Sequence, residues 1–69
     1  MSVDTNELWN IARKNGCKTK ISIAEKLNIS RDTVGKVMEG KEKPSAMFIE
    51  RFVTRFNVPP AKAGRIFFG

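Results

Sequence analysis

The sequence contains no histidine and no tyrosine, and it has a single cysteine. Without histidine, the chain lacks the imidazole group that most often serves as a general base or a metal ligand. One cysteine excludes an internal disulfide and a thiolate zinc site, and we expect Cys17 to be a small buried hydrophobe. Serines and carboxylates remain, but no base is placed beside a nucleophile. We therefore expect no enzymatic activity, no metal and no cofactor.

Long hydrophobic runs are also missing from the sequence. Nothing approaches the ~18 apolar residues of a membrane span, and residues 1–6 lack the apolar centre of a signal peptide. We expect a cytoplasmic protein that does not bind a membrane. The length of 69 residues predicts a single domain over 1–69. A domain of this size has a net stability of only ~3–5 kcal/mol, so binding to a partner would add a meaningful share of the total free energy of unfolding.

The charge of the chain is strongly basic. Thirteen lysines and arginines face seven acidic residues, which gives a net charge of +6. A small basic domain is typical of proteins that bind a polyanion. Nucleic acid is favoured over a membrane surface because no basic helix with a long apolar face is present.

Capping signals and apolar spacing predict an all-α chain with five helices and no strands. The expected helices run from Asp4 or Thr5 to Asn15-Gly16, from Lys20 to Leu27, from Ser30 to Gly40, from Ser45 to Asn57, and from Pro60 to about Phe68. Asp4, Ser30 and Ser45 are the predicted N-caps of three of these helices. The fourth helix carries an apolar stripe whose phenylalanines, Phe48, Phe52 and Phe56, are expected in the core.

The segment 20–39 has the spacing of a helix-turn-helix. Two short helices must touch through small and branched apolar side chains, which are Ala24, Leu27, Ile29, Val34 and Val37. Asn28 stands at the bend, where we expect a left-handed backbone conformation because asparagine tolerates it better than most residues.

The stretch from Leu8 to about Val58 resembles the phage repressor and Cro-type helix-turn-helix domains. The residues that carry the resemblance are Ile23-Ala24-Glu25-Lys26-Leu27, Ile29-Ser30-Arg31, Val34, Val37, Gly40 and Lys43-Pro44-Ser45. The resemblance implies a five-helix, lambda-repressor-like domain that is usually dimeric on operator DNA. The small basic format is similar to regulators of a phage lysis–lysogeny switch, either Cro-like or antirepressors of the modulator-of-repression kind. Ala12 and Met38 stand where many family members have an arginine–glutamate pair, which predicts an apolar contact instead.

The third predicted helix turns Val34, Val37 and Met38 inward, which leaves its polar residues outward. The resemblance implies base contacts by three of them, Arg31, Asp32 and Lys36. The same docking geometry places six residues near phosphate, namely Lys18, Lys20, Ser30, Thr33, Lys41 and Lys43. Two structural alternatives stay open. Asp32 and Lys36 have the spacing of an ion pair within one helix, and Gly35 is explained equally by a closely approaching partner surface or by packing.

Three aromatic residues are candidates for a protein interface: Trp9, Phe67 and Phe68. Trp9 is also explained as the edge of the core. Phe67 and Phe68 end a short terminal helix, and we expect at least one of them to pack across a subunit or partner boundary.

Two functions follow from these patterns. The first is a regulator that binds double-stranded operator DNA through residues 31–39, with a possible weak homodimer. The second is an antirepressor that binds the DNA-binding domain of a partner phage repressor, favoured by the balance of Arg31 and Lys36 against Asp32 and Glu39 on the outer face. An RNA-binding module is disfavoured because exposed aromatic residues beside basic ones are missing.

Overall fold

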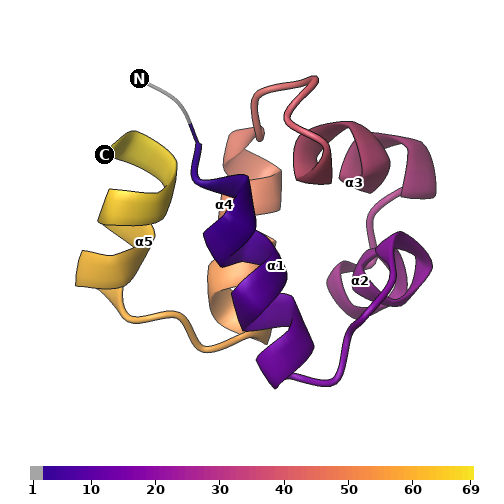
Figure 1. Ribbon diagram of the computed structural model, residues 1–69, viewed down its shortest axis with the longest axis horizontal. Helices are drawn as coiled ribbons and strands as arrows, with labels where there is room; N and C mark the ends of the chain where they lie inside the picture. Colours follow the sequence, from indigo (N-terminus) through magenta and orange to yellow (C-terminus); the bar gives the residue numbers. More distant parts are fainter. Residues whose placement is uncertain (1–2) are drawn as a thin grey trace.

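Residues 3–69, the part of the chain that the computed structural model describes, form five helices and no strand (Figure 1). The helices are α1 (Thr5–Lys14), α2 (Lys20–Leu27), α3 (Arg31–Met38), α4 (Ala46–Arg55) and α5 (Pro60–Phe68). The all-α prediction is therefore confirmed for these residues, and the expected helix limits agree with the observed ones to within about two residues. None of the five helices is long and apolar enough to cross a membrane. In Figure 1, α2 and α3 lie on one side of α1 and α5 lies on the other.

The helix starts are set by side-chain hydrogen bonds at the predicted caps. Asp4, Ser30 and Ser45 each accept a hydrogen bond from the backbone N–H three residues later, at 3.2 Å in every case. Thr19 caps α2 in the same way, accepting from the Ser22 N–H at 3.1 Å. Asn28 has φ 55° and ψ 47°, so the predicted left-handed conformation between α2 and α3 is also confirmed.

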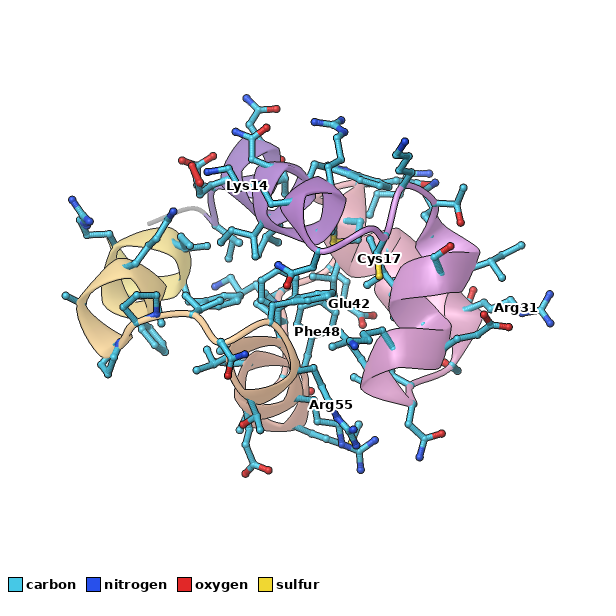
Figure 2. All side chains as sticks on the ribbon, turned by 90° about the horizontal axis from the view of Figure 1, so that it is seen from below. Lys14, Cys17, Arg31, Glu42, Phe48 and Arg55 are labelled. Carbon is cyan, nitrogen blue, oxygen red and sulfur yellow. The ribbon has the colours of Figure 1, made fainter. Side chains whose placement is uncertain are left out.

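The centre of the core is a group of phenylalanines around Phe52. Its ring stacks on Phe48 with the centroids 5.8 Å apart, and it meets Phe56 edge to face at 4.8 Å. A third ring, that of Phe67, contacts Phe52 edge to face at 5.9 Å. Pairs of this geometry add ~0.5–1.5 kcal/mol each beyond the burial of their area. Figure 2 shows Phe48 pointing into the middle of the helices, and the predicted core role of the α4 phenylalanines is confirmed.

The end of α5 places its two phenylalanines in different surroundings. Ile66 and Phe67 are buried within the chain's own core, at 2% and 6% exposure, whereas Phe68 is 60% exposed. The position of Phe67 is therefore explained by the chain's own core, and Phe68 is the exposed one of the two, so the interface role of this end stays a prediction. The physical reason is that α5 packs on α4 and the N-terminal segment covers it, with the Asp4 N–H donating to the Ile66 carbonyl at 3.1 Å. The short helix is thus packed against both α4 and the N-terminal part of the chain.

This packing predicts opposite results for two neighbouring phenylalanines. Phe67→Ala removes a buried ring and should cost ~3–5 kcal/mol, which is about the whole stability of a domain of this size. Phe68→Ala should stay within ~0.5 kcal/mol of the wild type because its ring is mostly in solvent. Circular dichroism during thermal unfolding measures both variants, and equal midpoints for the two would contradict this placement of α5.

Candidate nucleic-acid interface

The connection between α2 and α3 is short and held in place by another helix. Residues 28–30 join the two helices, and the Ile29 N–H donates to the Ala24 carbonyl at 3.1 Å. Arg51, from α4, donates through Nη1 to the carbonyl of Asn28 at 2.7 Å and to that of Leu27 at 3.4 Å. A guanidinium at the end of α2 suits the negative end of the helix dipole. Arg51 on α4 thus stabilises the angle between α2 and α3, a role that the sequence did not reveal.

One side of α3 is buried in the core. Val34, Val37 and Met38 are at most 2% exposed, as predicted. Ala12 lies in the same core at 0% exposure, so Ala12 and Met38, which stand where many members of the resembled family have an arginine–glutamate pair, are both buried apolar residues. The indole Nε1 of Trp9 donates to the Met38 carbonyl at 3.2 Å, which ties α1 to the end of α3.

Trp9 itself is partly buried at the edge of the core. The Arg13 guanidinium lies over its ring at 5.7 Å from the centroid. With its N–H bonded inside the protein and one ring face covered by Arg13, Trp9 is explained by packing. Its predicted interface role gains no support from these contacts.

The outward side of α3 carries the three residues predicted to read bases. Arg31 extends away from the body of the protein (Figure 2), and it has no ion pair within residues 3–69. Lys36 Nζ lies 3.2 Å from Asp32 Oδ2, which is the pair expected from their spacing. The hydrogen bond to the Asp32 carboxylate raises the pKa of Lys36 above its ordinary value. Arg31 is therefore the unpaired member of the predicted set.

Two of the lysines predicted near phosphate share one carboxylate, that of Glu39. Lys20 Nζ donates a hydrogen bond to Glu39 Oε2, and Lys41 Nζ lies 3.1 Å from Glu39 Oε1. The hydrogen bond from Lys20, followed by that from Lys41, lowers the pKa of Glu39. Lys20 and Glu39 are 19 positions apart, so sequence spacing carried no signal for this pair.

The other residues predicted near phosphate stay available on the surface. Lys18 and Lys43 are exposed and have no ion pair within the described part of the chain. The Ser30 hydroxyl donates to Thr33 Oγ1 at 2.9 Å, which leaves the hydroxyl hydrogen of Thr33 for another acceptor. Both hydroxyls stand at the N-terminus of α3, where the helix dipole favours an anion.

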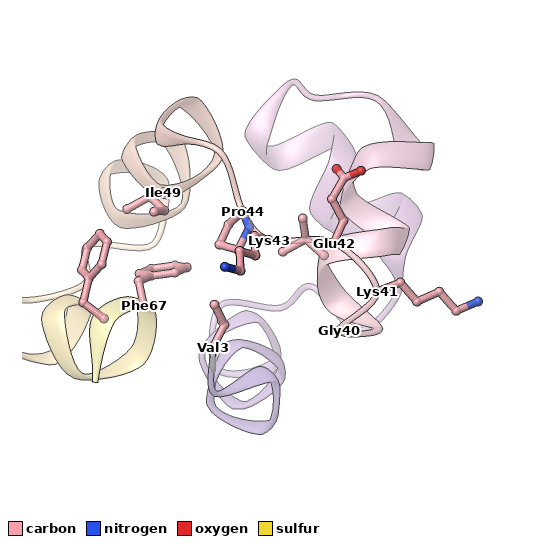
Figure 3. Close-up of a pocket in the computed structure, with 10 residues that line it drawn as sticks. Val3, Gly40, Lys41, Glu42, Lys43, Pro44, Ile49 and Phe67 are labelled. Atoms are coloured by element: carbon pink, nitrogen blue, oxygen red, sulfur yellow. The ribbon is translucent and has the colours of Figure 1, made fainter. Parts of the chain in front are cut away.

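A second surface, the α5 groove, lies beside the end of α3. It has a volume of about 690 Å³ and is lined by Val3, Val37, Gly40, Lys41, Glu42, Lys43, Pro44, Ile49, Phe67 and Phe68. In Figure 3, Phe67 and Val3 face Pro44 and Lys43 across the groove, whereas Lys41 extends away from it. The groove therefore combines apolar walls with charged residues of the loop after α3, which are Lys41, Glu42 and Lys43.

No protein-family model, curated protein or solved structure matches this chain. Residues 3–69 contain no group of three or more cysteine, aspartate or glutamate side chains placed to hold a metal ion. The features available for assigning a function are thus the outward side of α3, the basic loops beside it and the α5 groove.

The structure separates the two explanations of Gly35. A β-carbon at this position would lie 3.7 Å from Lys20 Cδ, which is an ordinary contact. Because alanine is ~1 kcal/mol better than glycine inside a helix, Gly35→Ala should stabilise the domain by up to that amount. Urea denaturation measures the change. A loss of stability would show that Lys20 cannot adjust, and packing would then explain the glycine.

Proposed function

We propose that this chain is a small transcriptional regulator with a lambda-repressor-like helix-turn-helix fold, which places α3 in the major groove of operator DNA. The observation that carries the proposal is the geometry of α3. The helix is buried on one side, capped by Ser30, and presents an unpaired Arg31 on the other. Exposed Lys18 and Lys43 stand on the loops before α2 and after α3. Their positions support contacts with the DNA phosphate backbone on both sides of the major groove.

Base readout is assigned mainly to Arg31. Its guanidinium matches the O6 and N7 acceptors of guanine, and no carboxylate within residues 3–69 competes for it. Lys36 and Asp32 form an ion pair in the free protein, so this pair must break before the two side chains can contact bases. Guanine would then take Lys36 and the cytosine N4 amine would take Asp32. This exchange costs an exposed ion pair, which is worth only ~0.2–0.5 kcal/mol within a helix.

Phosphate contacts are assigned to the loops and to the start of α3. Lys18 and Lys43 confer affinity without sequence information, and the hydroxyls of Ser30 and Thr33 suit a phosphate at the helix N-terminus. In a dimer, two copies would read half-sites about 34 Å apart, which is one turn of DNA. The regulator would need neither a cofactor nor catalysis and would act in the cytoplasm.

Arg31→Ala should lower affinity for the specific operator by ~1–3 kcal/mol and relax sequence preference. Lys43→Ala should instead weaken binding to all duplexes alike and flatten the salt dependence. Arg55→Ala, an exposed arginine near the end of α4, is the control with the same loss of charge. Fluorescence anisotropy with the neighbouring promoter DNA and a random duplex measures all three. Equal losses on both duplexes for Arg31→Ala would remove base readout from the proposal.

A second function is favoured by the α5 groove. Phe68 is 60% exposed where it lines this apolar surface, and large exposed aromatic residues mark protein interfaces. The internal pairing of Lys36, Lys20 and Lys41 also leaves the surface around α3 less basic than its lysines alone would make it. Both observations support an antirepressor that uses this groove to bind the DNA-binding domain of a partner repressor.

The antirepressor function predicts that Phe68→Ala lowers affinity for that partner by ~2 kcal/mol or more without unfolding the domain. Met47→Ala is the matched control because Met47 is 47% exposed and lies outside the groove. Sedimentation velocity of each variant, alone and mixed with the repressor encoded by the adjacent gene, distinguishes self-association from binding to the partner. Wild-type behaviour of Phe68→Ala both alone and in the mixture would remove the groove as an interface.

A further inference from the structure

One carboxylate holds two lysines that come from different parts of the fold. Glu39 is the C-cap of α3, Lys20 is the first residue of α2, and Lys41 lies on the loop after α3. The two ammonium groups bind different oxygens, Lys20 at Oε2 and Lys41 at Oε1. We call this arrangement of Lys20, Glu39 and Lys41 the Glu39 clasp.

The stem of Lys20 crosses the outward side of α3 to reach the clasp. Its Cδ lies 3.7 Å from the position of a β-carbon on Gly35, so the chain of methylenes runs over the helix where no side chain intervenes. The Lys20 and Glu39 side chains are 39% and 36% exposed, whereas Lys41 is 72% exposed. Lys20 is therefore held in the clasp more closely than Lys41.

The position of the carboxylate is unfavourable without its two partners. Glu39 stands at the C-terminal end of α3, where the helix dipole is negative and disfavours an acidic side chain. The two ammonium groups offset that repulsion, and their hydrogen bonds lower the pKa of Glu39. A negative charge thus sits beside the surface that the proposed function turns towards DNA.

We propose that Glu39 is an internal substitute for a DNA phosphate, which occupies Lys20 and Lys41 in the free protein and so limits the sequence-independent affinity of the domain. Its two oxygens accept from two lysines in the way that the two non-bridging oxygens of a phosphate would. A phosphate of the bound duplex must displace the carboxylate to reach these lysines and is then repelled by it. Binding to random DNA is weakened in this way, while readout by Arg31 is untouched. The inference rests on the proposed function of DNA binding.

The test compares two substitutions that change the charge equally. Glu39→Gln frees both lysines, and Glu42→Gln removes a neighbouring exposed carboxylate that holds no ion pair within residues 3–69. On a random-sequence duplex at low salt, Glu39→Gln should bind about 10-fold tighter than Glu42→Gln. It should also steepen the slope of log affinity against log salt by up to about 1.8, because two more phosphates are neutralised at ~0.9 each.

A double-mutant cycle isolates the clasp from the general effect of charge. Lys20→Met should change random-duplex affinity by less than about 2-fold in the wild type, where Glu39 already occupies the ammonium group. In the Glu39→Gln background the same substitution should remove most of the gained affinity. Lys14→Met, on α1 and outside the clasp, should have equal effects in both backgrounds.

NMR of the wild-type protein provides a measurement that needs no substitution. The side-chain carboxyl carbon of Glu39 should keep its chemical shift when the random duplex is added, as that of Glu25 should, because Lys20 and Lys41 stay bound to Glu39 in the wild type. Equal affinities and salt slopes for Glu39→Gln and Glu42→Gln, or a Glu39 carboxyl carbon that shifts in the wild-type protein bound to random DNA, would overturn the clasp and leave DNA binding intact. Failure of every variant to bind any duplex would overturn the proposed function and the clasp with it.

Discussion

The arrangement of the surface depends on the one-sided burial of α3. Val34, Val37 and Met38 are removed from water against α1 and α2, which fixes the rotation of the helix about its own axis. Rotation by a third of a turn would expose these side chains and bury charged ones, both of which cost free energy. The outward position of Arg31 is therefore a consequence of hydrophobic packing on the opposite side.

The cations around α3 fall into two classes once this packing is set. Arg31, Lys18 and Lys43 have no acidic partner within residues 3–69, whereas Lys36, Lys20 and Lys41 are each paired. An exposed pair contributes little to stability, with a median of ~0–1 kcal/mol. Its larger effect is on the field that an approaching polyanion meets, since a paired lysine attracts phosphate less. Net charge alone thus overstates how basic this side of the protein is.

The α5 groove and the outward side of α3 meet at the loop between α3 and α4. Lys41 contributes to the Glu39 clasp and also lines the groove, and Lys43 stands at the groove beside Pro44. The two surfaces therefore share residues of one loop.

Sequence patterns predicted the five helices, three of their N-caps, the left-handed bend at Asn28 and the buried side of α3. These features depend on hydrogen bonds within three or four residues and on apolar periodicity, both of which are local. The helix-turn-helix resemblance and the DNA-contacting roles stay predictions. Tertiary structure alone decided the burial of Phe67, the support of the α2–α3 turn by Arg51 and the pairing of Lys20 with Glu39. Those contacts join residues 15 to 24 positions apart, and the angles between packed helices, which no local pattern encodes, bring them together.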